Sequence, residues 1–339
     1  MAAIPYRFKS PRTNHVVYVS EEDEPGDGIA FLVEMATDPQ TVAVFGTGFV
    51  FLVAVALTYL RWRPAWRDVA AFRSALASYT DLLPWLLRLG FGLPLVGAGI
   101  MGEFFNPALT PPLLPEVIRV GQLVAGFALL FGFATRAIAA LTLGVYLVSL
   151  PFVPTLIISP EWAFGLFVIV LLGSGRPSAD QVIERVAATQ GTLIGRLDPV
   201  HVYAPNLRAA VTPVRSYVPT ILRVGLGTTF IALGVLEKLL APNMAAAVAA
   251  EYGLTAVPIP VEYWVLGAGL TEVLLGTAIL VGLFTRAATL VALVMFVAAL
   301  FVIPDDPVLA HVGLFSMISA LLITGAGPVS VDRWVTARR

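Results

Sequence analysis

Nine apolar segments constrain the fold of this chain more than any other feature of its sequence. Several of them contain the roughly 17–25 apolar residues that an α-helix needs to cross the hydrocarbon core of a bilayer. Charged residues make up only 13% of the 339 residues, against about 25% in a typical soluble domain, which leaves too little polar surface for a water-soluble globule. The sequence therefore predicts an all-α polytopic membrane protein with about nine transmembrane helices, near residues 41–60, 84–104, 116–133, 137–153, 160–174, 218–239, 262–283, 287–303 and 308–324.

The charge balance and the absence of cysteine exclude several classes of function. The formal net charge is −1, so no general attraction to nucleic acid is expected. The chain has no cysteine and three histidines, which excludes disulfides, thiolate metal sites and iron–sulfur ligation on this chain. We therefore expect no metal site and no intrinsic cofactor.

The arginines around the apolar segments predict how the chain lies in the membrane. Cytoplasmic loops of membrane proteins carry an excess of Lys and Arg. If the N-terminus lies outside, fourteen arginines fall on the cytoplasmic side, and only Arg119 and Lys238 fall at outer helix ends. We therefore expect a multi-pass protein of the cell membrane with its N-terminus outside and its C-terminus in the cytoplasm.

A short pattern, Gly-x-x-Thr-Arg, occurs twice, as GFATR at 132–136 and as GLFTR at 282–286. Three further matches keep the same order: LLRLGFG with ILRVGLG, Gln122 with Glu272, and GSGRPSAD with GAGPVSVD. Ordered matches across four segments indicate a duplicated four-helix unit. Because each unit has an even number of spans, the copies are parallel repeats related by an axis along the membrane normal.

The repeat divides the chain into two four-helix bundles with additional segments. The predicted parts are a polar N-terminal tail at 1–40, an extra span with an amphipathic surface helix at 41–82, a first unit at 83–180, a cytoplasmic linker at 181–216 and a second unit at 217–339. Each Gly-x-x-Thr-Arg turn would end the second helix of its unit and start the third, with the threonine as N-cap. A contact of Arg286 with a lipid, a quinone or a partner is the alternative reading of the second turn.

Glu272 is the most informative polar residue within the apolar segments. It lies about ten residues into its span, which is too far from either headgroup layer for a glutamate side chain to reach. An ionisable residue at that depth costs roughly 2.5–3.5 kcal/mol and is a functional candidate. We expect Arg223 to be its partner, either as a structural pair or beside a carboxylate that handles protons or binds a ligand.

Four polar residues gather at the outer helix ends of the second unit: Glu237, Lys238, Glu262 and His311. They could form one polar ligand pocket, in which the histidine would titrate near physiological pH, or they could anchor the helix ends at the interface. The first unit has Gln122 in place of Glu272. We therefore expect any chemistry to lie in the second unit.

With these residues in view, the second unit resembles the DoxX/DoxD family of four-helix membrane proteins. The resemblance rests on LRVGLGTTFIALGVLEKL at 222–239, an acidic residue in the second helix, GLFTR, and the closing GAGPVSVD. Residues 84–180 match more weakly, so the chain resembles a fused pair of such units. Members of this family include the membrane subunit of thiosulfate:quinone oxidoreductase and subunits of other redox assemblies.

Three functions fit these observations. The first is a membrane subunit of a quinone-linked oxidoreductase, in which Glu272 handles a proton, Arg223 keeps it charged, and protein partners carry the redox centres. A quinone needs no metal or thiol for binding, since polar side chains in an apolar pocket suffice. The second function is a non-catalytic scaffold of a larger membrane complex, and the third is a small-solute transporter. Whether the chain itself is an enzyme stays open at this point.

Overall fold

The computed structural model describes residues 26–62, 66–105, 116–189, 191–193, 195, 209, 211–254, 259–303 and 308–337. Its regular structure over these residues is entirely helical. Within the described ranges, five helices are long and apolar enough to cross a membrane, beginning with α2 (Pro39–Trp62). The prediction of an all-α polytopic membrane protein is confirmed.

Each of the nine predicted apolar segments contains a helix. Besides α2, the first unit holds α4 (Leu83–Met101), α5 (Glu116–Phe131), α6 (Thr135–Ser149) and α7 (Glu161–Leu172). The second unit holds α11 (Val218–Gly234), α13 (Val261–Val281), α14 (Thr285–Val302) and α15 (Val308–Thr324). Short elements lie between them or after the last one: α3 (Trp66–Ala77), η1 (Thr80–Leu82), η2 (Pro154–Ile158), α8 (Ala179–Ala187), η3 (Val235–Leu239), α12 (Pro242–Glu251) and α16 (Val331–Ala337).

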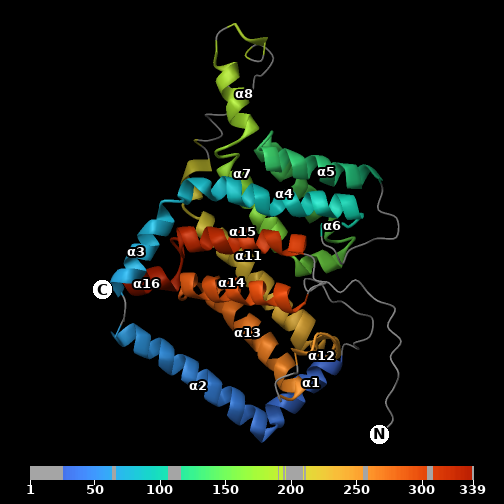
Figure 1. Ribbon diagram of the computed structural model, residues 1–339, viewed down its shortest axis with the longest axis vertical. Coiled ribbons are helices and arrows are strands. Elements are labelled where there is room, and N and C mark those ends of the chain that lie inside the picture. Colours follow the sequence, from blue (N-terminus) through green and yellow to red (C-terminus); the bar gives the residue numbers. More distant parts are fainter. Residues whose placement is uncertain are drawn as a thin grey trace.

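The two units pack against each other through their first and fourth helices. Helix α4 lies on α15, and α7 lies on α11, so the first helix of each unit meets the fourth helix of the other (Figure 1). A Cβ added to Gly90 would overlap Ser316, and a Cβ added to the equivalent Gly225 would overlap Phe164. Close approach at small residues is the usual way in which membrane helices gain packing energy.

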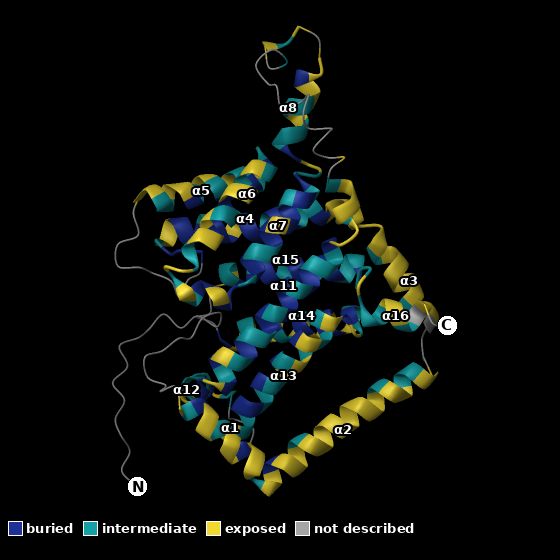
Figure 2. Ribbon diagram, turned by 180° about the vertical axis from the view of Figure 1, so that it is seen from behind, coloured by how far each residue is buried: buried dark blue, intermediate teal, exposed yellow. Residues whose placement is uncertain are grey.

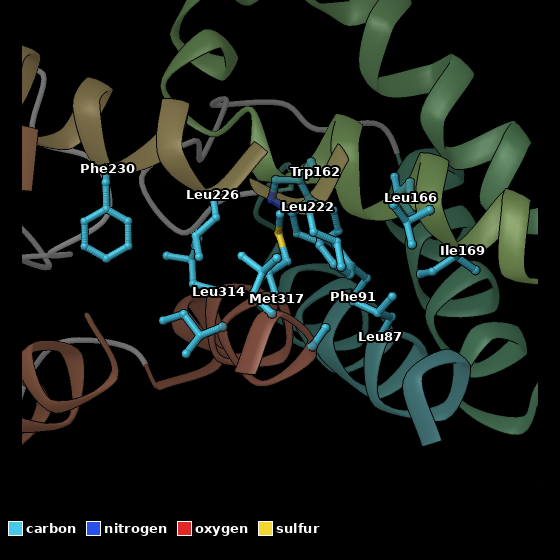
Figure 3. Close-up of a cluster of buried hydrophobic side chains, with 14 of the residues drawn as sticks. Leu87, Phe91, Trp162, Leu166, Ile169, Leu222, Leu226, Phe230, Leu314 and Met317 are labelled. Carbon is cyan, nitrogen blue, oxygen red and sulfur yellow. The ribbon is translucent and has the colours of Figure 1, made fainter. Parts of the chain in front are cut away.

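Leucine and aromatic side chains fill this interface between the units. Figure 3 shows Leu87 and Phe91 of α4 facing Leu222 and Leu226 of α11, with Met317 of α15 between them, and all five are fully buried. Within each unit the first two helices also cross at glycines, Gly92 with Gly126 and Gly227 with Gly276. The core therefore lies on the contact of the two units.

The two ends of the bundle differ in what covers them. One end, called the turn end below, holds both Gly-x-x-Thr-Arg turns and the short helices α3 and α16. The opposite end, called the cavity end, holds α12 and α1 (Asp27–Thr37) (Figure 1). The polar tail predicted at 1–40 is therefore wrong for its last part, because residues 27–37 form α1, which buries apolar side chains such as Met35. Residues 1–25 lie outside the described part of the chain.

Helix α2 stands apart from the rest of the protein. Figure 2 shows it exposed along most of its length, and only 6% of its most apolar window is buried. It touches the second unit near its two ends, where Phe45 packs edge-on against Tyr263 and Tyr59 packs edge-on against Phe284. Apolar side chains exposed along a helix of this length suit contact with lipid.

Candidate functional site

Each Gly-x-x-Thr-Arg turn is closed by an aspartate from the end of its own unit. Asp332 accepts hydrogen bonds from the backbone N–H groups of Phe284 and Thr285, at 2.7 and 2.9 Å. Asp180 makes the equivalent bonds in the first unit, at 2.6 and 3.1 Å. The prediction that the threonine is the N-cap is wrong, because both threonines are the first helical residue and make no capping bond. Both remote carboxylates satisfy the free N–H groups of the helix start.

The arginine of each turn is bound to the end of a neighbouring helix. Arg286 donates from Nε to the carbonyl of Leu322 at 2.8 Å and from Nη2 to the carbonyl of Ile323 at 2.9 Å. Arg136 donates to Leu171 at 3.4 Å. A cation at a helix C-terminus complements the helix dipole. The structure thus places Arg286 at the turn end, beside the last turn of α15, and does not bring it to the polar cluster predicted for ligand binding.

Arg223 also lies at the turn end, so the predicted contact between Arg223 and Glu272 is wrong. Arg223 is 2% exposed. Its guanidinium donates to the carbonyl of Val329 and lies under the turn at Gly282, where an added Cβ would overlap it. In the first unit Arg88 donates to Pro177 at 2.6 Å. An arginine in this position joins the start of the first helix to the closing segment in both units. The physical reason for the error is distance along the helix: Arg223 belongs to the first turns of α11, whereas Glu272 faces its opposite end.

A cavity of about 250 Å³ opens at the cavity end of the second unit. Its wall is formed by η3, α12, α13 and α14, and most of its lining side chains are apolar. They include Met244, Val248, Trp264, Met295 and Phe296. The volume is just below the roughly 300–1,000 Å³ of pockets that hold drug-sized ligands. The polar part of the wall comes from three charged residues, Glu237, Lys238 and Glu272.

These three residues form the charged cluster of the cavity. Lys238 Nζ lies 2.9 Å from Glu272 Oε2 and 3.9 Å from Glu237 Oε2. The Lys238 side chain is 12% exposed, and those of Glu237 and Glu272 are 2% and 5% exposed. Two carboxyl groups therefore share one ammonium group at the edge of an apolar cavity. Buried charges of this kind are stable only when they are paired.

A π-helical turn places Glu237 and Lys238 in the cavity wall. The turn η3 continues α11, and the backbone N–H of Leu240 donates to the carbonyl of Val235 at 2.8 Å, five residues earlier. Such a turn changes the direction in which the next side chains project, and π-turns within helices are frequent at functional sites. The helix α4 of the first unit instead ends at Gly102 in a left-handed conformation.

In the first unit, uncharged hydrogen bonds of Gln122 take the place of the ion pair between Glu272 and Lys238. Gln122 donates from Nε2 to the carbonyl of Glu103 at 2.8 Å and accepts from the backbone N–H of Phe105 at 3.1 Å. The Phe105 ring packs on Tyr146 at a centroid distance of 5.5 Å, whereas Phe296, which aligns with Tyr146, lines the cavity of the second unit. Glutamine in place of Glu272 thus ties down a loop instead of holding a cation.

Of the four residues predicted to form an outer cluster, Glu237 and Lys238 are brought together with Glu272. Glu262 is exposed on the first turn of α13 and lies outside the cavity lining. His311 is fully buried on α15, and its ring lies edge-on to Phe296, with the centroids 5.5 Å apart. The histidine therefore contacts a residue of the cavity wall, Phe296, but is not itself part of the lining.

Sequence reasoning missed two features of this end of the protein. Glu161 is buried where α7 meets α11, and Thr229 donates to its Oε2 at 3.0 Å. Its position just after a proline at a predicted helix start resembled an ordinary helix terminus, so no signal marked it as buried. Helix α12, which supplies one wall of the cavity, falls between the predicted spans 218–239 and 262–283, where no element was predicted.

Comparison with known proteins matches residues 218–305 to the DoxX family model. No curated protein and no solved structure matches the chain. The matched residues run from the start of α11 to just beyond the end of α14, and so include the whole cavity wall. The resemblance predicted for the second unit is confirmed, while that of residues 84–180 stays a prediction. The chain is a multi-pass membrane protein in which residues 218–305 of the second unit match the DoxX family model.

Proposed function

We propose that the protein is a membrane subunit of a quinone-linked oxidoreductase and that it binds the quinone head group in the cavity of the second unit. The observation that carries this proposal is the charged cluster of Lys238, Glu237 and Glu272 in the wall of an otherwise apolar cavity. A ring with two carbonyl oxygens needs apolar walls for its faces and a donor for its oxygens. The DoxX family is often linked to oxidoreductase-related function, which supports the same class.

Each residue of the charged cluster has a role in this proposal. The ammonium group of Lys238 can donate three hydrogen bonds, so it can serve Glu272 and a ligand carbonyl together. Glu272, 2.9 Å from that ammonium, is the group that exchanges a proton with the bound molecule. A bound quinone would accept two electrons and two protons on reduction. The electrons come from a protein partner, since this chain has no cysteine for a cluster of its own.

The orientation predicted from the arginines is part of the proposal. The turn end, with Arg136, Arg223 and Arg286, lies at the cytoplasmic face, and the cavity end lies near the outer face. The excess of arginine on one side supports this assignment. Because the chain has no cysteine, a single cysteine introduced at the exposed Val329 or at the exposed Glu262 can be tested with a membrane-impermeant thiol reagent on whole cells. Labelling at residue 262 alone supports the orientation, and labelling at residue 329 alone overturns it.

Quinone binding tests the proposed site directly. The purified protein in nanodiscs is titrated with a short-chain ubiquinone, and quenching of tryptophan fluorescence reports binding, because Trp264 lines the cavity. We expect Glu272→Gln and Lys238→Met each to weaken binding by about tenfold or more, which corresponds to about 1.4 kcal/mol. Glu262→Gln is the matched control, since it removes an exposed carboxylate from the same helix. Equal affinity in all four proteins would show that the quinone does not bind at the charged cluster.

A further inference from the structure

Helix α1 is packed on the segment of the protein that carries the charged cluster. Gly28, in its first turn, approaches the chain so closely that an added Cβ would overlap the backbone of Leu240. Leu240 directly follows the π-helical turn η3. The side chain of Asn243, in the first turn of α12, donates to Asp27 at 3.3 Å. The start of α1 is therefore seated on the junction of η3 and α12.

The rest of α1 joins an apolar cluster with the same turn. Met35 is buried with Leu239 of η3 and Leu266 of α13, and Phe31 and Leu32 pack against them. Leu239 adjoins Lys238 in the chain, and its side chain lies where a Cβ of Gly269 would fall. The face of the turn opposite the cavity is thus held between α1 and α13.

The junction of α1 and α2 is fixed to α13 as well. Asp38 accepts hydrogen bonds from the backbone and the hydroxyl of Thr41, both at 2.7 Å, and from the hydroxyl of Tyr263 at 3.4 Å. Phe45 of α2 packs edge-on against the Tyr263 ring. Contacts at both of its ends therefore fix α1 in place over η3.

From these contacts we propose that α1 is a positioning element of the cavity. It holds the π-helical turn so that Lys238 stays beside Glu272 and faces the cavity. A π-helical turn is rare, and its hydrogen bonds span five residues instead of four. The contacts of α1 with Leu239 and Leu240 support this turn from outside. The short helix that precedes the extra span then serves the ligand site of the same chain. This proposal rests on the proposed function only for its effect on quinone binding.

Gly28 in the first turn of α1 and Gly26 at its N-cap provide a matched pair of variants. Gly28→Ala places a methyl group against the backbone of Leu240, which cannot rotate away as a side chain could, and so pushes α1 off η3. Gly26→Ala meets nothing within 4 Å, and its φ of −82° suits alanine. Should Gly28→Ala fail to fold, Met35→Ala takes its place, because it removes packing from the same cluster without overlap.

Hydrogen exchange followed by mass spectrometry tests the positioning without any ligand. We expect Gly28→Ala to speed exchange in peptides covering 235–241 while peptides from α4 and α7 stay unchanged, and we expect Gly26→Ala to match the wild type. The same exchange in both variants would overturn the proposal.

A double-mutant cycle tests whether α1 acts through Lys238. With a short-chain ubiquinone as probe, Gly28→Ala should weaken binding by about tenfold (about 1.4 kcal/mol) in the wild-type background and by much less in the Lys238→Met background, because residues that act through one another are not additive. Equal losses in both backgrounds would refute the role of Lys238. If the wild type binds no quinone, the proposed function fails while the exchange result still decides whether α1 holds the turn.

Discussion

The ion pair of Lys238 and Glu272 allows a prediction whose size follows from the structure. The two groups are 2.9 Å apart with side chains 12% and 5% exposed, so each depends on the other for compensation of its charge. Removing one partner of a buried pair costs about 3–5 kcal/mol because it leaves the other charge buried. Lys238→Met removes the cation that both Glu237 and Glu272 face, and we expect its loss of folding free energy to lie in that range.

Glu272→Gln should destabilise the protein less than Lys238→Met does. The amide keeps the shape and an acceptor oxygen for Lys238, and the lysine still has Glu237 at 3.9 Å, so the expected loss is about 1–3 kcal/mol. In the double variant both members of the ion pair are replaced by uncharged side chains, so neither leaves the charge of the other buried. We expect it to be more stable than the sum of the single losses by about 1–3 kcal/mol.

Reversible unfolding in mixed detergent micelles, followed by circular dichroism, measures these free energies. Glu262→Gln, on the same helix but exposed, should lie within about 0.5 kcal/mol of the wild type. Single losses that add within about 0.5 kcal/mol would refute the reasoning, because they would mean that the lysine and the glutamate do not stabilise each other in the membrane.

Three further predictions concern the turn end and the junction of α1 and α2. Asp332→Ala and Asp180→Ala should each destabilise the protein by about 0.5–2 kcal/mol in unfolding measurements, since each carboxylate caps a helix start, and no effect in either would refute the capping. Gly282→Ala should destabilise the protein by more than about 1 kcal/mol because the φ of Gly282 is +73°. Gly144→Ala meets nothing within 4 Å and should stabilise α6 by about 0.5–1 kcal/mol. Equal effects of the two variants would contradict backbone strain at residue 282. Hydrogen bonds from the side chain and backbone of Thr41 lower the pKa of Asp38 in the folded protein below its ordinary 3.8. The ionised Asp38 therefore stabilises the fold at a pH above the unfolded pKa, and this stabilisation is lost as the pH falls through the folded pKa. Asp38→Asn should remove this part of the acid sensitivity in melting curves recorded between about pH 5 and about pH 3, and an unchanged acid response would argue against it.

The fold could be predicted from the sequence because the membrane simplifies it. Backbone groups in hydrocarbon must bond within their own helix, so an apolar segment such as 262–283 has one available structure and becomes α13. Gly92 and Gly126 of the first unit correspond to Gly227 and Gly276 of the second, so the first two helices cross in the same way in both units. Helix α1 was missed because it has only 11 residues, which is too short for a span, and because its place is set by packing against Leu239 and Leu266.

The candidate site could be predicted only in part. Depth in the span identified Glu272 as buried, and the charge pattern identified Glu237 and Lys238 at a helix end. The partner of Glu272 could not be predicted, because the π-helical turn rotates Lys238 into the cavity and regular helical spacing does not include such a turn. Arg223 and Arg88 hold the same place in the two repeats, and that place reflects the bond of each arginine to the closing segment of its own unit.

Photoaffinity labelling tests the central claim, that the cavity of the second unit binds a quinone, most directly. An azido-quinone is bound to the wild type in nanodiscs, activated by light, and mapped by mass spectrometry of the digested protein. The account predicts labels confined to residues 237–303, in η3, α12, α13 and α14, and loss of those labels in Lys238→Met. Labels on the first unit, or equal labelling of the Lys238→Met variant, would contradict it.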